Sequence, residues 1–205
     1  MFTNQPELEG LKLAPMEPIS YAARDGLTIH GYLTKPVGVS APTSAVLLVH
    51  GGPWARDTWG YRAQAQWLAN RGYVVLQVNF RGSTGYGKDF LNAGNREWGA
   101  KMHDDLVDGV NWLVEKGIAN KDKIAIMGAS YGGYSTLVGL TFTPEVFAAG
   151  VDIVGPSSLI TLTQTIPPYW EPLKKQFFYR VGNLETEPDF LQSRSPLFFV
   201  DKIQK

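Results

Sequence analysis

Short apolar runs alternate with segments of helical spacing through the middle of this 205-residue chain, and this alternation constrains the fold more than any other feature. Four runs have the length of buried strands: residues 44–50 (SAVLLVH), 73–80 (YVVLQVNF), 123–128 (KIAIMG) and 147–155 (FAAGVDIVG). Apolar residues recur at intervals of three and four in residues 61–72 and again from Met102 to about Gly117, as amphipathic helices require. Strands that alternate with helices of this length form a mostly parallel sheet with helices on both faces. The sequence therefore predicts the α/β class.

The two ends of the chain depart from this alternation. An alternating stretch at residues 27–34 (LTIHGYLT) predicts one strand of a hairpin or meander. From about Pro156 onward the regular pattern lapses, and residues 167–183 mix five aromatic side chains with three prolines and several charges. We expect an excursion or small cap whose aromatic residues either pack it onto the sheet or line an apolar substrate pocket. No strand-like run follows, so we expect residues 1–205 to form a single α/β domain that is incomplete at its C-terminus.

Composition narrows the classes of function. Nineteen basic and nineteen acidic side chains cancel, so no global field attracts nucleic acid or an anionic membrane. The chain has no cysteine, which excludes disulfides, thiolate catalysis and Cys-based zinc sites and suits a cytoplasmic location. It begins with neither a basic segment nor an apolar run, and nowhere do eighteen apolar residues stand together, so we expect no export signal and no membrane span. The remaining classes of binding partner are a small molecule, a peptide or another protein.

Residues 127–134 (MGASYGGY) carry the strongest chemical signal. Gly128, Ser130 and Gly132 fit the pattern G-x-S-x-G, and they follow an apolar strand and precede a segment that can start a helix. In this context the pattern predicts a nucleophile elbow, a sharp turn that presents Ser130 while small neighbours let strand and helix approach closely. The N-terminus of that helix would also favour negative charge developing nearby. The alternative is a glycine-rich turn with an idle serine, because the pattern alone is weak evidence.

Residues 50–61 (HGGPWARDTWGY) begin at the edge where open α/β sheets bind their ligands. Two adjacent glycines, Gly51 and Gly52, allow backbone N–H groups to point into a crevice, which is what an oxyanion hole needs. The second donor would be the N–H of Tyr131, directly after the candidate nucleophile. The alternative is a loop whose glycines only relieve backbone strain.

Two further motifs lead to sites that we reject. Gly82, Gly87 and Lys88 match seven positions of a phosphate-binding loop, but Asp89 stands where a hydroxyl must hold magnesium and would repel the phosphates. Residues 103–108 (HDDLVD) group a histidine with three aspartates, yet acidic residues are typical of the first turns of a helix and no second ligand cluster accompanies them. We predict no metal and no organic cofactor.

Six segments, taken together in their order and spacing, resemble a known family. They are PISYAARDGLTIHGYLTKP, VLLVHGGPWARDTWGY, VNFRGSTGYGKDF, DDLVDGVNWLVEKG, DKIAIMGASYGGYSTLVGLT and SPLFFVDKI. The chain resembles the peptidase domain of the prolyl oligopeptidase family of serine peptidases, especially its acylaminoacyl-peptidase and dipeptidyl-peptidase-like branch. The resemblance implies an α/β-hydrolase fold, Ser130 as acyl-forming nucleophile, an oxyanion hole involving Tyr131, His50 and Gly51, and short peptides or blocked peptide ends as substrates. Family members usually carry a β-propeller before this domain, and we expect none within residues 1–205.

The sequence offers no triad partners for Ser130. In α/β-hydrolases the acid and the histidine follow the serine in chain order, whereas His30, His50 and His103 all precede Ser130. His50 should lie near the elbow, but by resemblance its position serves the oxyanion region rather than the base. We therefore expect neither the triad Asp nor the triad His in this chain, and almost no peptidase activity from the chain alone.

Three interpretations stay open. The chain is an incomplete piece of a serine peptidase, which we favour; or a partner polypeptide supplies the last strands and the histidine; or the chain is a non-catalytic interaction module. A carboxylesterase would use the same serine chemistry. In each case the sheet ends in an apolar, unpaired edge that invites self-association or a partner chain.

Overall fold

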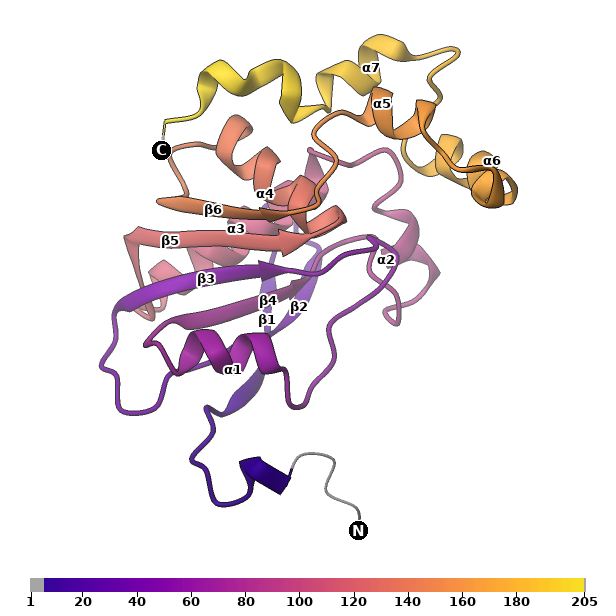
Figure 1. Cartoon of the computed structure of the whole chain (residues 1–205). Helices are drawn as coiled ribbons and strands as arrows, with labels where there is room; N and C mark the ends of the chain where they lie inside the picture. Colours follow the sequence, from indigo (N-terminus) through magenta and orange to yellow (C-terminus); the bar gives the residue numbers. More distant parts are fainter. Residues whose placement is uncertain (1–5, 205) are drawn as a thin grey trace.

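The apolar runs form a six-stranded mixed sheet in the computed structural model, which describes residues 6–204 (Figure 1). Its strands are β1 (Met16–Ala22), β2 (Thr28–Thr34), β3 (Thr43–Val49), β4 (Val74–Asn79), β5 (Ala119–Ala129) and β6 (Ala149–Ile153). They lie in the order β1-β2-β4-β3-β5-β6. β1 pairs with β2 and β2 with β4 in antiparallel fashion, whereas the pairs of β4, β3, β5 and β6 are parallel. The predicted α/β class is confirmed.

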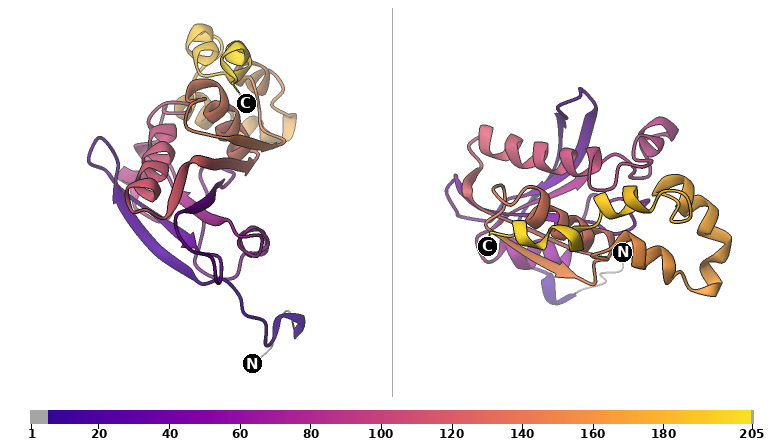
Figure 2. Two further views of the ribbon diagram at one scale, coloured as in Figure 1. Left: turned by 90° about the vertical axis from the view of Figure 1, so that its left-hand side faces the viewer. Right: turned by 90° about the horizontal axis from the view of Figure 1, so that it is seen from above.

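Helices cover both faces of the sheet. They are α1 (Ala63–Ala69), α2 (Lys88–Asn92), α3 (Lys101–Glu115), α4 (Tyr131–Phe142), α5 (Leu159–Gln164), α6 (Glu171–Arg180) and α7 (Pro188–Ser193). Successive strand residues point to opposite faces, so Leu47 and Leu76 join the core with α3 and α4, while Val46 and Val75 pack with α1. Figure 2 shows α1 and α3 on opposite sides of the sheet. Because both faces are covered, every residue of β4 is buried, which explains why its sequence does not alternate.

Glycines end the two helices that the periodicity predicts most clearly. Gly72 follows α1 with φ +88°, and Gly117 follows α3 with φ +64°, in the left-handed region that favours glycine. Five of the helices and strands were not predicted: α5, α6 and α7 after β6, and β1 and α2. β1 is a mostly exposed edge strand that contains Pro18, and α2 has only five residues, too few to show a period.

The segment after β6 is helical and contains no strand within residues 154–204. It comprises α5, α6, α7 and the 3₁₀ turns η2 (Pro168–Trp170) and η3 (Pro196–Lys202), and it projects from one end of the molecule (Figure 2). Phe177 of α6 packs edge-on against Trp54 and Trp98, with ring centroids 6.5 and 6.0 Å apart. At least part of the aromatic excursion therefore packs onto the loops at the sheet edge, as one of the two interpretations predicted.

β6 forms one edge of the sheet and pairs only with β5 in the part of the chain that the structure describes. Its apolar residues Val151 and Ile153, and Val154 just after it, are exposed, the last with 83% of its surface accessible. The expected apolar, unpaired edge is therefore present among the described residues. Between residues 6 and 204 no helix has the length and apolar character needed to cross a membrane.

Candidate active site

Ser130 occupies the sharp turn that joins β5 to α4 at the carboxyl edge of the parallel strands. Its φ of 57° and ψ of −116° are sparsely populated for a residue with a side chain and cost about 1–3 kcal/mol. Its backbone N–H donates to the carbonyl oxygen of Ile153 at 2.9 Å, which ties the turn to β6. The residue is exposed. An exposed serine held on a strained strand-to-helix turn is the arrangement of a nucleophile elbow.

The glycines around Ser130 permit a contact that no larger residue would allow. A Cβ atom on Gly128 would overlap the backbone of Gly132, and one on Gly132 would overlap the carbonyl oxygen of Val49. A Cβ atom on Gly133 would overlap the carboxylate of Asp152. The start of α4 is thus pressed against the ends of β3, β5 and β6, which fixes the turn that carries Ser130.

Tyr131 can serve the site only through its backbone. Its ring is 2% exposed and packs against Phe80, Trp98 and Tyr134, with centroids 5.2, 4.6 and 5.7 Å away. As the first residue of α4, it has an N–H group with no acceptor inside the helix. That donor lies directly after the serine, where acyl-transfer enzymes place one oxyanion contact.

His50 follows β3, and three contacts hold its half-buried ring. The ring stacks on Phe80 with centroids 4.5 Å apart and an interplanar angle of 13°. Its Nδ1 lies 2.8 Å from the carbonyl oxygen of Gly51, and its Nε2 lies 3.1 Å from Oγ of Ser83. Burial lowers the pKa of His50, so the neutral ring donates from Nδ1 to the carbonyl and accepts at Nε2 from the serine hydroxyl. Neither nitrogen is free to take a proton from Ser130.

The Gly51–Gly52 peptide lies beside the nucleophile turn. A Cβ atom on Gly51 would stand 3.2 Å from the carbonyl oxygen of Ala129 and 3.5 Å from Cβ of Ser130. The peptide is trans and its carbonyl faces His50, so the N–H of Gly52 points away from that ring. Gly52 is exposed, and neither its N–H nor that of Gly51 donates to any acceptor within residues 6–204. This loop therefore holds open backbone donors next to Ser130.

A buried ion-pair network that sequence reasoning missed supports this edge. The carboxylate of Asp105, fully buried on α3, accepts from the backbone N–H of Arg81 at 2.8 Å, from its Nε at 2.9 Å and from its Nη2 at 2.7 Å. Arg81 also donates from Nη1 to Asp25 at 2.7 Å, which lowers the pKa of Asp25 to about 2. The network fixes the residues after β4 that carry Ser83. The aspartate of the HDDLVD motif at position 105 is thus an internal partner of an arginine.

The other two histidines lie elsewhere. His103 is buried on α3, with Nε2 2.8 Å from Oγ1 of Thr143, and burial lowers its pKa to about 4. His30 stacks on Tyr86 with centroids 5.0 Å apart. Among the described residues, no group of three or more His, Cys, Asp or Glu side chains is placed to hold a metal ion.

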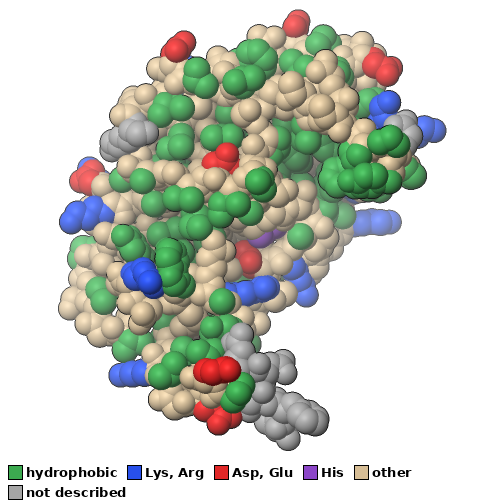
Figure 3. Space-filling model, in the orientation of Figure 1, with side chains coloured by type: hydrophobic (Ala, Val, Ile, Leu, Met, Phe, Trp, Pro, Cys, Tyr) green, Lys and Arg blue, Asp and Glu red, His purple; other side chains and the backbone are tan. Residues whose placement is uncertain are grey.

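A cavity of about 370 Å³ borders the elbow and is lined by His50, Gly51, Gly128 and Ala129 on one side. Asp57 and Gln77 line its polar wall. Each has a buried side-chain oxygen without a hydrogen-bond partner in the described chain, and burial raises the pKa of Asp57. Figure 3 shows a hollow on this face with a histidine at its base, and a cluster of apolar side chains on the neighbouring projection.

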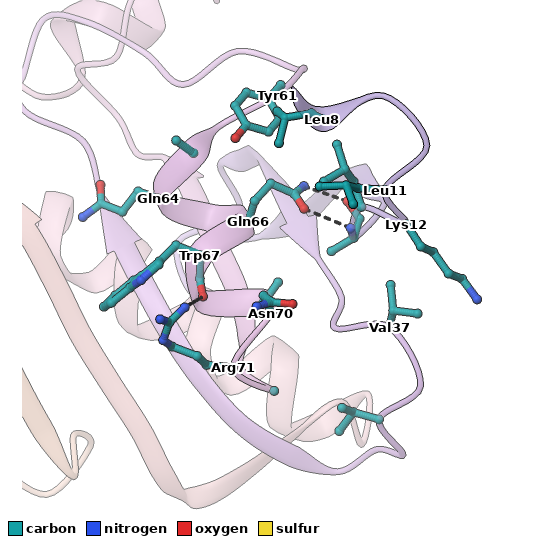
Figure 4. A pocket seen from close by; sticks show the side chains of 16 residues that line it. Leu8, Leu11, Lys12, Val37, Tyr61, Gln64, Gln66, Trp67, Asn70 and Arg71 are labelled. Atoms are coloured by element: carbon teal, nitrogen blue, oxygen red, sulfur yellow. Dashed lines mark hydrogen bonds between the residues drawn. The ribbon is translucent and has the colours of Figure 1, made fainter. Parts of the chain in front are cut away.

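A larger groove of about 790 Å³ lies away from the elbow, between the N-terminal segment, the β2–β3 connection and α1 (Figure 4). Leu8, Leu11, Val37 and Trp67 line it. Its walls are joined by the side-chain amide of Gln66, which both donates to and accepts from the backbone of Ala14. Ser130 lines neither space, but the smaller cavity is bordered by the residues just before it, Gly128 and Ala129, and the larger groove is not. The smaller cavity is therefore the one assigned to the candidate site.

Comparisons with known proteins agree with this arrangement. A model of the prolyl oligopeptidase family matches residues 59–204. The chain belongs to the prolyl oligopeptidase family. It is 55% identical over 215 residues to "Dipeptidyl aminopeptidase BIII" of Pseudoxanthomonas mexicana, covering 100% of this chain and 31% of that relative. It is 49% identical over 228 residues to "Dipeptidyl peptidase family member 6" of Caenorhabditis elegans, covering 99% and 31%.

Solved structures of the family share the fold. The uncomplexed acylaminoacyl peptidase of Pyrococcus horikoshii superposes with a TM-score of 0.86 at 28% identity, covering 100% of this chain and 32% of that one. A puromycin-hydrolyzing peptidase of Mycobacterium tuberculosis gives a TM-score of 0.83 at 29% identity, covering 93% and 29%. The expected α/β-hydrolase fold and the resemblance to serine peptidases are confirmed. The chain spans about a third of the length of the curated relatives that it matches.

Proposed function

We propose that this chain contributes the nucleophile and the oxyanion-binding half of a serine peptidase that works through an acyl-enzyme on Ser130. The observation that carries the proposal is the strained and exposed backbone position of Ser130, at φ 57° between β5 and α4, in a member of this family. Oγ of Ser130 attacks the scissile carbonyl and gives its proton to a base. The base returns that proton to the leaving amine, and water then hydrolyses the acyl-enzyme.

The oxyanion would be stabilised by backbone donors from two loops. The N–H of Tyr131 is one donor, and the loop of His50, Gly51 and Gly52 supplies the other. Within that loop we favour the N–H of Gly52, because the carbonyl of Gly51 is turned toward His50 and the opposite side of the same peptide is open. His50 then acts as a support for the loop rather than as the general base.

The base would be a histidine that lies outside residues 1–205. His30, His50 and His103 are each held by other partners in the structure. Loss of one member of a serine triad costs on the order of a millionfold in kcat, or roughly 8 kcal/mol of transition-state stabilisation. Oxyanion stabilisation and substrate binding alone accelerate the reaction only about 10³–10⁴-fold over the uncatalysed reaction in water. Residues 1–205 by themselves should therefore be almost inert as a peptidase.

The substrates would be short peptides cleaved near their N-termini. This follows the names of the similar proteins, which include a dipeptidyl aminopeptidase and an acylamino-acid-releasing enzyme of Arabidopsis thaliana. A carboxylesterase would form the same acyl-enzyme, so activity on a dipeptide anilide and on a simple acyl ester should be compared. A cytoplasmic location remains the prediction from the absence of cysteine.

The test is labelling with a fluorophosphonate probe, in which Oγ displaces fluoride from phosphorus. The purified native protein that contains this sequence should label, Ser130→Ala should not, and Ser135→Ala, which removes a buried hydroxyl from the same helix, should label like the wild type. Equal labelling of the wild type and Ser130→Ala would show that Ser130 is not the nucleophile. Residues 1–205 alone should label far more slowly than the native protein.

A second candidate is a chain that is completed by a partner polypeptide, and the exposed edge of β6 favours it. Intact-mass measurement of the native protein and of whatever co-purifies separates the alternatives. A second polypeptide that brings a histidine would support completion by a partner. A single longer polypeptide that labels at Ser130 would exclude it, and absence of labelling in either case would favour a non-catalytic interaction module.

A further inference from the structure

Ser83 contacts the ring of His50 through its hydroxyl but has no part in the proposed chemistry. It is fully buried in the loop after β4, and its Oγ lies 3.1 Å from Nε2 of His50. The loop itself is fixed on both sides. The backbone N–H of Ser83 donates to the carbonyl of Phe80 at 3.0 Å, and that of Thr84 donates to the carbonyl of Ala55 at 3.0 Å.

We propose that Ser83 is a positioning residue. Its hydroxyl holds the His50 ring in the orientation in which Nδ1–H donates to the Gly51 carbonyl oxygen. The N–H of Gly52, on the opposite side of the Gly51–Gly52 peptide, is then left free to donate to the oxyanion. The proposal rests on the proposed function for its catalytic consequence. Its structural part concerns only the ring and the peptide, and it can be tested without any activity.

Protonation chemistry makes the serine hydroxyl a necessary partner. The carbonyl of Gly51, 2.8 Å from Nδ1, is an acceptor only, so Nδ1 must carry the proton. Nε2 of the neutral ring is then a bare acceptor in a half-buried position, and the hydroxyl of Ser83 is its only donor within the described residues. The stack on Phe80 fixes the plane of the ring but supplies no donor.

Removal of the hydroxyl should therefore turn the ring. An acceptor left buried and unpaired costs more free energy than one ordinary hydrogen bond contributes. With Ala at position 83, Nε2 can regain a hydrogen bond only if the ring turns and exposes it to water. That rotation breaks the hydrogen bond between Nδ1–H and the Gly51 carbonyl. The freed carbonyl no longer sets the direction of the Gly52 N–H.

The structural part is tested by NMR on the native protein labelled with ¹⁵N-histidine. Three histidines are present in this sequence, and His50→Phe identifies the His50 signals. The wild type should show His50 with a protonated Nδ1, a bare Nε2 and a slowly exchanging Nδ1–H. In Ser83→Ala that proton should exchange at least about tenfold faster, because the bond that protects it is broken in a larger fraction of molecules. A wild-type His50 protonated at Nε2, or an unchanged exchange rate in Ser83→Ala, would overturn the proposal whether or not Ser130 reacts.

The catalytic part is tested by the rate of fluorophosphonate labelling and by kcat and KM on a dipeptide anilide. Loss of one well-placed oxyanion donor lowers kcat about 10²–10³-fold. A donor that is only misdirected, as in Ser83→Ala, should lower kcat and the labelling rate about 10–100-fold with little change in KM. Thr141→Val, which removes an equally buried hydroxyl from α4 that donates to the Leu137 carbonyl, should leave both unchanged.

A double-mutant cycle separates positioning from general loosening of the fold. His50→Phe keeps the stack on Phe80 but has no ring nitrogen, so Ser83→Ala should have no further effect on kcat in that background. A second, additive loss would show that Ser83 acts by another route and would refute the proposal. If the wild type and Ser130→Ala label equally, the proposed function fails, and the exchange rate of Nδ1–H still decides the role of Ser83.

Discussion

The buried imidazole of His103 should make the stability of this protein depend on pH in a narrow window. His103 is 5% exposed on α3, and its Nε2 donates to Oγ1 of Thr143, which in turn lies 3.3 Å from the carbonyl oxygen of Gly139. Its Nδ1 is buried without a partner in the described chain. Burial lowers the pKa of His103 from 6.5 to about 4, and the nearby Arg24 adds to the shift. The folded protein therefore holds this ring neutral.

The sign and size of the effect follow from linkage. Between pH 6.5 and about 4, the unfolded chain binds a proton at this position that the folded chain refuses, so the free energy of unfolding falls as the pH falls. The difference between a pKa of 6.5 in the unfolded chain and about 4 in the folded chain corresponds to a limit of about 3.4 kcal/mol, of which about 2.5 kcal/mol should be lost between pH 7.5 and pH 4.5. That is a large fraction of the stability of an ordinary domain.

Urea unfolding at pH 7.5 and pH 4.5 checks this prediction. His103→Gln removes the titrating group at position 103 and leaves the other titrating groups in place, so it should lose about 2–3 kcal/mol less than the wild type between the two pH values. Thr143→Val removes the hydroxyl partner and keeps the imidazole, so it should be less stable at pH 7.5 and retain the pH dependence. The reasoning is refuted if the wild type and His103→Gln lose the same free energy between pH 7.5 and pH 4.5.

Three further predictions concern the elbow and its support. Gly132→Ala should destabilise the fold by several kcal/mol in chemical denaturation, because its Cβ would overlap the Val49 carbonyl, whereas Gly72→Ala, at φ +88° with open space around it, should cost only about 1–2 kcal/mol. Asp105→Asn should cost about 3–5 kcal/mol in the same assay, since it leaves Arg81 buried without its main charged partner; a loss below 1 kcal/mol would refute the role of that pair. Imidazole added to residues 1–205 should accelerate fluorophosphonate labelling of the wild type but not of Ser130→Ala, and a rate independent of imidazole would argue against a missing base.

The sequence predicted the elements whose pattern is local. The buried strands follow from short apolar runs, and the turn at Ser130 follows from glycines whose spacing matches a strand, a sharp turn and a helix. β1 was missed because an exposed edge strand does not need alternating apolar residues, and its sequence includes Pro18. The start of β5 at Ala119 was missed because residues 120–122 are polar and mostly exposed, so the apolar run becomes visible only from about Lys123.

The supports of the site could not be predicted, because they join residues that are distant in the sequence. Arg81 and Asp105 are 24 residues apart, and Ser83 and His50 are 33 residues apart. Each side chain alone has an ordinary surface interpretation, since most arginines, aspartates and serines are exposed. Only the packing of α3 against the sheet shows that Asp105 is inside, and only the contacts with Phe80, Ser83 and the Gly51 carbonyl show how the ring of His50 is held.

The two halves of the site differ in how they are specified. In the proposed site, the oxyanion donors and the nucleophile come from the carboxyl ends of β3 and β5, and Ser83 follows β4; these strands are neighbours in the sheet and are held in register by pairs such as Val49 with Gly128. Their relative positions therefore depend on backbone hydrogen bonds and on close glycine contacts within residues 6–204. A base needs none of these contacts. It must only reach the exposed Oγ of Ser130, so the pre-organised half of the site can form first and accept its base from another segment afterwards.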